Sequence, residues 1–309
     1  MQHYRSLDPV SLNNAWLTIG SFDGVHRGHQ ILISRLVEQA HAAGDPAAVV
    51  TFFPHPVKVL RGLSGRYYLT GPEERARLLS ALGVDAVITL TFDLELASQT
   101  AETFMRNLAE HTRLRQLWIG PGFALGKGRE GSADRLRQLG EQMGYRLTVM
   151  ESVTVDGEMV SSSQIRHLLQ QGQVREAARL LGRDYSLLGP VIPGDARGRR
   201  IGIPTANLGV WEEQIIPANG VYATRAVIDG EVIASVTSVG VNPTFENQPE
   251  NPRVEAHLLD FNGDLYGRQL EVQFVERLRE EIRFSTVEAL VNQIQQDIHT
   301  AKEILDHAR

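Results

Sequence analysis

The stretch Gly20–His29, which reads GSFDGVHRGH, decides the first half of the fold. It follows the short apolar run 15–19 (AWLTI) and precedes an amphipathic stretch over 30–43, so the pattern predicts a strand, a glycine-rich turn and a helix. Glycines let the backbone approach a ligand closely, and a helix start offers N–H groups at the positive end of the helix dipole. The stretch therefore predicts an anion site directly after the first strand.

The same alternation of apolar runs and amphipathic stretches continues along the chain. Further strands are predicted at 47–53, 85–90, 117–119 and 146–150, and helices at 73–82, 100–111, 132–143, 163–170 and 174–181. Continuous apolar strands separated by helices indicate a parallel sheet covered on both faces. We therefore expect an α/β fold with its ligand at the carboxyl ends of the strands.

The pattern changes after Gly182-Arg183-Asp184, and most of the following strand-like runs are separated by Gly or Pro. These runs lie at 185–192, 221–228, 231–239, 254–259 and 270–274. Asp229-Gly230 between two of them is a hairpin signal, because a two-residue type I′ turn requires positive φ. The second half therefore predicts an antiparallel barrel or sandwich, followed by a helix that starts at Ser285 with a capping pair to Glu288. The predicted domains are 1–184 and 185–309.

Composition excludes several classes of protein. The 309 residues carry a net charge of −6 and no cysteine, which rules out disulfides, thiolate chemistry and cysteine-based zinc sites. A net negative charge argues against a dedicated nucleic-acid binder. The first residues lack the apolar region of a secretory signal, and no run approaches the roughly 20 apolar residues that span a bilayer. A cytoplasmic protein without membrane partners is expected.

His26 and His29 stand three residues apart at the predicted helix start. In that position both would face one anion and could stabilise charge on a triphosphate. Taken alone, a pair of this kind is more often part of a glycine-rich turn carrying two surface histidines, and a metal site lacks a third ligand. A serine-rich turn that enters a helix, Ser161-Ser162-Ser163, together with Arg166 one turn later, adds donors suited to phosphate oxygens.

A second phosphate-type segment lies in the predicted antiparallel half, over 189–208. Its glycines and arginines suit phosphates, and Thr205 and Asn207 alternate with Pro204 and Ala206, so both side chains point to one side and offer hard oxygens for Mg²⁺. A solvated basic loop is the alternative interpretation. Strand alternation also places Glu255 and His257 on one face, and a glutamate near a phosphoryl site can accept a hydroxyl proton, although a lone strand glutamate is more often solvent-exposed.

Taken together, these motifs resemble the prokaryotic bifunctional riboflavin kinase/FAD synthetase family over residues from about 10 to about 305. The matching runs are GSFDGVHRGH from Gly20, TFFPHP from Thr51, SSSQIR from Ser161, GR from Gly198, GIPTANL from Gly202, GVYA from Gly220, NPTF from Asn242, VEAHLL from Val254 and LYG from Leu265. The resemblance implies a Rossmann-like nucleotidyltransferase domain that adenylylates FMN, followed by a six-stranded β-barrel kinase domain that phosphorylates riboflavin.

Site residues follow from the resemblance. It implies that Glu255 deprotonates the ribityl hydroxyl, that Thr205 and Asn207 hold Mg²⁺ and phosphates, and that His26 and His29 hold the triphosphate of ATP in the first domain. The implied adenylyltransferase contacts to ATP also include Gly20, Phe22, Asp23, Gly24, Ser161, Ser162, Ser163 and Arg166. The implied kinase contacts to ATP also include Gly194, Gly198, Arg199, Gly202 and Pro204, with Arg283 and Phe284 on the flavin side. Riboflavin, FMN and ATP are the implied partners, and a homo-oligomer is left open.

One departure from the family pattern concerns the loop after the fourth predicted strand. The family has Asp or Asn where this chain has Gly122, and an aromatic residue where it has Leu125. Losing one hydrogen bond to a charged ligand costs about 1.5–3 kcal/mol, which predicts slower adenylyl transfer. Ser163 in place of Thr is a milder change. A kinase with a weakened or inactive adenylyltransferase domain is therefore the alternative to a bifunctional enzyme.

Overall fold

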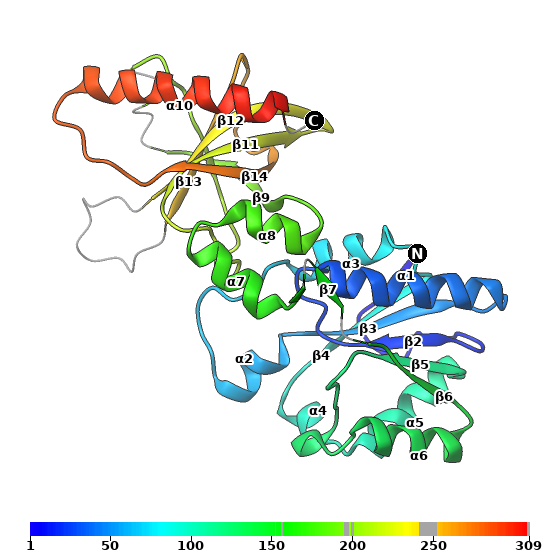
Figure 1. The fold of residues 1–309 in the computed structure, drawn as a ribbon. Helices are drawn as coiled ribbons and strands as arrows, with labels where there is room; N and C mark the ends of the chain where they lie inside the picture. Colours follow the sequence, from blue (N-terminus) through cyan, green and yellow to red (C-terminus); the bar gives the residue numbers. More distant parts are fainter. Residues whose placement is uncertain (152, 156, 195–197, 199–200, 241–251, 308–309) are drawn as a thin grey trace. The chain divides into compact units, whose positions relative to one another are not determined.

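The computed structural model describes every residue except 152, 156, 195–197, 199–200, 241–251 and 308–309 (Figure 1). The chain forms two compact units, Met1–Ser162 and Ser163–Arg309. The predicted division near residue 184 therefore differs from the division by compactness, because helices α7 (Ser162–Gln170) and α8 (Val174–Leu181) group almost entirely with the second unit.

A six-stranded sheet forms the centre of the first unit, in the order β1-β4-β3-β2-β5-β6 with every neighbouring pair parallel. The strands are β1 (Gln2–Tyr4), β2 (Trp16–Ile19), β3 (Ala47–Phe53), β4 (Ala86–Thr91), β5 (Gln116–Ile119) and β6 (Arg146–Val149). A small antiparallel pair, β7 (Thr154–Val155) and β8 (Glu158–Met159), follows. The predicted parallel sheet is confirmed. Among the described strands of this unit, β1, β7 and β8 lie outside the predicted runs.

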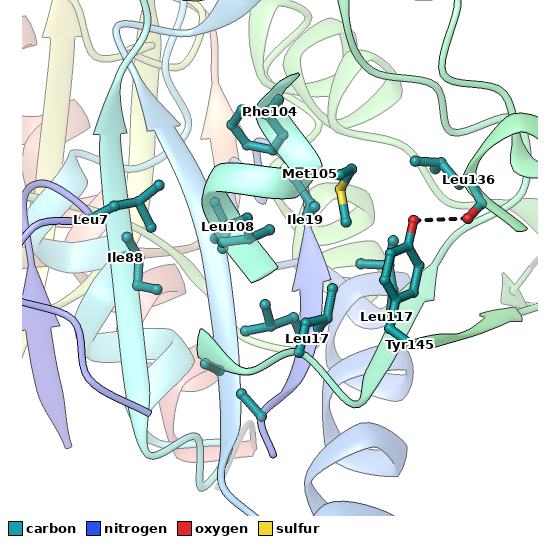
Figure 2. Close-up of a cluster of buried hydrophobic side chains, with 14 of the residues drawn as sticks. Leu7, Leu17, Ile19, Ile88, Phe104, Met105, Leu108, Leu117, Leu136 and Tyr145 are labelled. Atoms are coloured by element: carbon teal, nitrogen blue, oxygen red, sulfur yellow. Dashed lines mark hydrogen bonds between the residues drawn. The ribbon is translucent and has the colours of Figure 1, made fainter. Parts of the chain in front are cut away.

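Helices cover both faces of this sheet, as the continuous apolar strands predicted. The helices are α1 (Arg27–Ala42), α2 (Pro56–Arg61), α3 (Pro72–Ser80), α4 (Leu94–Ser98), α5 (Ala101–Thr112) and α6 (Ala133–Met143), with a 3₁₀ turn η1 (Lys127–Arg129). On one face, Leu17 and Ile19 of β2 pack with α5 and α6, and the Tyr145 hydroxyl donates to the carbonyl of Leu136 at 2.8 Å (Figure 2). On the other face, Trp16 packs with α1 and α3.

A closed antiparallel barrel forms the centre of the second unit, in the order β10-β13-β12-β11-β14-β9. The strands are β9 (Tyr185–Ile192), β10 (Ala206–Leu208), β11 (Gly220–Ile228), β12 (Glu231–Gly240), β13 (Arg253–Leu258) and β14 (Gln269–Arg279). Asp229 and Gly230 both have positive φ at the β11–β12 turn, as the hairpin signal predicted. The six-stranded barrel implied by the resemblance is confirmed.

The long helix α10 (Val287–His307) lies across β11, β12 and β14 of the barrel (Figure 1). It begins one residue later than predicted. The hydroxyl of Thr286, and not that of Ser285, accepts the N–H of Ala289 at 3.1 Å. The predicted capping pair of Ser285 and Glu288 is therefore wrong by one residue. In the described part of the chain no helix combines the length and the apolar character needed to cross a membrane.

Candidate functional site

The chain order of the first sheet reverses at β2. From β2 the chain proceeds to β3 and β4 on one side, and it returns to β5 on the other side. Such a reversal leaves a crevice at the carboxyl ends of the two strands, which is where α/β sheets bind ligands. The turn that holds His26 follows β2, and the loop that holds Gly122 follows β5, so the structure places both at this reversal.

His26 and His29 form a close pair at the start of α1. Their rings stack with centroids 3.6 Å apart, and His26 Nδ1 accepts the N–H of His29 at 3.3 Å, so His26 is the N-cap of the helix. An Nδ1 that accepts a hydrogen bond carries no proton, which makes Nε2 the N–H donor of a neutral His26 ring. Two neutral rings at a helix N-terminus present donors to an anion without the cost of burying charge.

The His29 ring is in contact with the rings of Phe22 and His26. Phe22 packs edge-on against its ring with centroids 5.1 Å apart, and His29 Nδ1 is buried with no hydrogen-bond partner in the described structure. Burial, together with smaller effects from His26 and Arg75, holds the pKa of His29 well below its usual value. Gly28 is needed here because an added Cβ would come within 3.1 Å of the His26 ring.

Asp23 supports the turn from below with its carboxylate. It is buried, it accepts the N–H groups of Leu69 and Thr70 at 3.1 Å, and its Oδ1 lies 3.8 Å from Arg75 Nη2. Arg75 also donates to the carbonyl of Ser21 at 2.8 Å. The Asp23 side chain is thus engaged within the protein, so a contact of this residue with ATP would come from its backbone.

Sequence reasoning missed Arg75. This side chain is fully buried beneath the turn that follows β2, where its positive charge lies next to the Asp23 carboxylate. Its position in an ordinary amphipathic stretch with acidic and basic neighbours carries no signal of burial, since buried arginines are rare.

A hydrogen bond joins the serine-rich turn to the turn after β2. The Ser162 hydroxyl donates to the carbonyl of Asp23 at 2.9 Å, which joins two segments that are 139 residues apart in the chain. Ser161 lies beside it and is partly exposed, while Ser163 and Arg166 fall in the second compact unit, where Ser163 is exposed and Arg166 is buried.

Thr205, Asn207 and Glu255 come together on one side of the barrel. The Thr205 hydroxyl donates to Glu255 Oε2 at 3.2 Å, and Asn207 of β10 stands directly opposite Glu255 of β13 in the antiparallel ladder. Directly opposite residues of antiparallel strands project to the same face. His257, two residues along β13, faces the same way, and its Nδ1 lies 2.7 Å from the carbonyl of Pro204.

The glycine-rich loop before β10 closes on this group. An added Cβ at Gly194 would overlap the Asn207 amide, and one at Gly198 would overlap the carbonyl of Ile203. Gly202 has φ of +77° and allows the chain to turn back toward Thr205. The predicted phosphate contact Arg199 lies outside the described residues, as does the run 242–245.

Two cavities of the barrel share Thr205 in their linings. One, of about 360 Å³, is lined by Pro204, Ala206, Ala256 and the loop 261–266, which includes Phe261 and Tyr266. The other, of about 210 Å³, lies between the barrel and α10 and is lined by Glu255, His257, Phe284, Leu290 and Ile294, among others. Thr205 is the residue common to both linings. Thr205 therefore borders both cavities, whereas Glu255 lines the one between the barrel and α10.

Comparison with protein families matches both units. Residues 8–164 match a family described as FAD synthetase, and residues 181–305 match one described as riboflavin kinase. A Pseudomonas fluorescens protein named bifunctional riboflavin kinase/FMN adenylyltransferase is 38% identical over 93% of this chain and 92% of its own length. The chain belongs to the bifunctional riboflavin kinase/FMN adenylyltransferase family.

Other members of this family show the same extent of similarity. The Escherichia coli K12 protein of that name is 36% identical over 93% of this chain and 91% of its own length. A crystal structure from Streptococcus pneumoniae, described as a macrolide-efflux protein, superposes with a TM-score of 0.87 at 29% identity and covers 97% of this chain and 98% of that one. The fold is therefore shared across the whole length of the chain.

The loop after β5 carries the departure from the family pattern. Gly122 has φ of +68°, and an added Cβ there would meet no atom within 4 Å. Its carbonyl accepts a hydrogen bond from Arg129 Nη2 at 2.9 Å. The loop is thus folded without a side chain at 122, and the position is exposed.

The group on the barrel fits a magnesium ion by its chemistry. A hydroxyl, an amide and a carboxylate are hard oxygen donors of the kind that Mg²⁺ takes alongside substrate phosphates. Across the described ranges, no cluster of three or more His, Asp or Glu side chains forms a site for a protein-held metal. A cation here would therefore depend on the nucleotide for much of its coordination.

Proposed function

We propose that the chain phosphorylates riboflavin with ATP to give FMN, and then transfers AMP from a second ATP to FMN to give FAD and pyrophosphate. Membership of the family supports both reactions. One observation supports the assignment of the kinase reaction to particular residues. Thr205, which lines both cavities, donates a hydrogen bond to Glu255, which lines one of them. A phosphoryl donor and acceptor approaching from the two sides would meet there.

The lining chemistry indicates which substrate enters which cavity. Glu255 lines the cavity beneath α10 and can accept a proton only from a hydroxyl in that cavity. Phe284, Leu290 and Ile294 supply the apolar surface that an isoalloxazine ring needs. Riboflavin therefore occupies this cavity, with its ribityl end at Glu255, and the nucleotide occupies the larger cavity beside Phe261 and Tyr266.

In the kinase reaction Glu255 removes the proton from the ribityl hydroxyl, and the Thr205 hydroxyl holds the carboxylate in place. Thr205 and Asn207 would hold Mg²⁺, which when bound neutralises charge on the transferred phosphate. Gly194 lets the loop lie against the Asn207 amide, which fixes the orientation of that side chain.

In the adenylyl transfer His26 and His29 donate hydrogen bonds to the triphosphate at the N-terminus of α1. Because both rings are preorganised by stacking and by the N-cap bond, charge that develops on the α-phosphate meets donors that need not reorient. Ser161 and Ser162, which belong to the same compact unit as the two histidines, would contact the leaving pyrophosphate. The same role for Ser163 and Arg166, which the resemblance implies, stays a prediction. The kinase-only alternative has no support from the comparisons, since the FAD synthetase match covers residues 8–164.

We also propose an adenylyltransferase domain over residues 1–184 and a kinase domain over 185–309, with the boundary close to the start of the riboflavin kinase match at residue 181. A cytoplasmic location, the use of Mg²⁺ and a homo-oligomeric state stay predictions.

The direct test is to incubate the purified chain with riboflavin, ATP and Mg²⁺ and to separate the flavins by chromatography. FMN is expected first and FAD after it, and supplied FMN is expected to give FAD without riboflavin. Absence of FMN would overturn the kinase assignment, and absence of FAD from supplied FMN would overturn the adenylyltransferase assignment. Reactions without ATP serve as the control.

A further inference from the structure

Arg279 and Asp297 form a two-point ion pair in the wall of the cavity that contains Glu255. Arg279 Nε lies 3.0 Å from Asp297 Oδ1 and its Nη2 lies 2.7 Å from Oδ2. The two side chains are 17% and 5% exposed, and Gln293 Nε2 donates to the same carboxylate at 3.0 Å. A buried, bidentate pair of this kind is specific in geometry, so it holds β14 and α10 in one arrangement.

The pair sets the rotation of α10 over the cavity. Leu290, Ile294 and Asp297 stand at i, i+4 and i+7, so they share one face of the helix, and all three line the cavity. Within the described part of α10, Asp297 is the first buried residue, whereas Ala301 and Leu305 anchor the second half on the barrel. The half of the helix that covers the cavity is therefore held mainly at Asp297.

Arg279 also contacts the segment between β14 and α10. Its guanidinium carbon lies 5.9 Å from the centre of the Phe284 ring, and its Nη1 donates to the carbonyl of Glu280 at 2.9 Å. The same side chain thus supports the aromatic wall of the cavity and, through Asp297, the aliphatic wall. Glu281 and Glu255 are the other charged groups of the lining, together with His257, and none of them is paired with Arg279.

We propose that Arg279 and Asp297 are positioning residues for the riboflavin kinase reaction, which hold Phe284, Leu290 and Ile294 as the apolar wall that receives the flavin ring. This inference rests on the proposed function. The pair acts through those three side chains, and the Thr205–Glu255 bond does not depend on it. Its loss is therefore expected to weaken flavin binding and to leave proton transfer and nucleotide binding in place.

The test uses Arg279→Lys, which keeps the charge and loses the two-point geometry, and Asp297→Asn, which keeps the shape and loses the charge. For each variant and for the double variant we expect the KM for riboflavin to rise roughly 10-fold, with kcat changed by less than about 3-fold and the KM for ATP unchanged. The double variant should resemble the single ones, because the pair acts as a unit.

A matched control is the Arg225–Asp184 pair, which is 2.8 Å long, 20% and 27% exposed, and lines neither cavity. Arg225→Lys and Asp184→Asn should have the riboflavin KM of the parent chain, even where they lower the thermal stability as much as the Arg279 and Asp297 variants do. If the control variants shift the riboflavin KM as much, or if the ATP KM shifts with it, the pair is merely structural and the inference fails.

Riboflavin binding by quenching of flavin fluorescence separates this inference from the proposed function. If the parent chain forms no FMN, the proposed function fails, and the binding measurement still decides the inference. Weaker riboflavin binding by Asp297→Asn, at unchanged binding by Asp184→Asn, supports it. Equal binding by the parent and Asp297→Asn chains overturns it even when FMN formation is intact.

Discussion

Glu255 lines the cavity between the barrel and α10 and accepts a hydrogen bond from the Thr205 hydroxyl. A general base contributes about 10²–10⁴-fold to rate, so Glu255→Gln should lower FMN formation by that factor. Adenylylation of supplied FMN should be unchanged, because His26 and His29 belong to the other unit. Glu231→Gln, on the exposed β11–β12 hairpin, is the control and should leave both reactions as they are. An equal loss of both reactions in a folded Glu255→Gln chain would contradict the assignment of one reaction to each unit.

Gly122 offers a test of the departure from the family pattern. Gly122 has a φ of +68°, which strains any side chain, but Asn tolerates positive φ better than most residues and an added Cβ at 122 meets no atom within 4 Å, so Gly122→Asn should fold at a small cost in backbone strain. If the missing polar side chain slows adenylyl transfer, Gly122→Asn should raise FAD formation from supplied FMN by up to about 10- to 150-fold. Steady-state rates with FMN and ATP measure this. An unchanged rate would show that the chain compensates for the glycine elsewhere.

His29 predicts an acid-sensitive contribution to stability. Burial holds the pKa of His29 below its usual value in the folded chain, so the unfolded chain binds its proton first as the pH falls below about 6.5. The free energy of unfolding should therefore drop more between pH 7 and pH 5 in the parent chain than in His29→Gln, by at most about 2 kcal/mol. Denaturant titrations followed by tryptophan fluorescence report this, since Trp16 and Trp118 are buried in the first unit. The same pH dependence in both chains would mean that His29 binds its proton as readily in the folded chain as in the unfolded chain.

At the scale of the element, α10 depends on a cap that lies one residue from the sequence prediction. Because Thr286, and not Ser285, accepts the N–H of Ala289, Thr286→Ala should destabilise the start of α10 by about 0.5–2 kcal/mol, and Ser285→Ala should have little effect. Amide hydrogen exchange over 289–294 measures the difference. Faster exchange in Ser285→Ala than in Thr286→Ala would restore the predicted cap.

The start of α1 shows how an element builds a site. The strand β2 delivers the chain to a turn, Gly28 leaves room for the His26 ring, and the N-cap bond of His26 orients the ring at the helix start. His26 thus ends the turn, caps the helix and supplies a ring at the predicted anion site.

At the scale of the whole molecule, the proposed function places adenylyl transfer at His26 and His29 in one compact unit and phosphoryl transfer at Glu255 in the other. If FMN leaves the kinase site before it is adenylylated, a mixture of Glu255→Gln and His29→Ala chains should convert riboflavin to FAD, although neither does so alone. The yield of FAD with time, followed by chromatography, measures this, and each variant alone is the control. No FAD from the mixture, with the remaining activity of each variant intact, would show that FMN passes directly within one molecule.

The sequence by itself predicted the two architectures and most of their elements. Strand β3 and helix α8 have the predicted bounds, because apolar spacing of two or of about 3.6 residues is a local property that short segments carry on their own. The alternation that puts Glu255 and His257 on one face was predicted for the same reason. The placement of His26 and His29 at a helix start followed from the glycine-rich turn after an apolar run.

Contacts between distant segments were decided by the tertiary structure alone. The three-residue strands β1 and β10 are too short to carry a pattern and exist because neighbouring strands bind their backbones. The burial of Arg75 beneath the β2 turn follows from packing, as does the pair of Arg279 with Asp297. Thr205 meets Glu255 across 50 residues of chain because the closing barrel brings β10 beside β13. Hydrogen bonds and ion pairs of this kind need two partners, and the spacing of residues within one segment holds no record of the other.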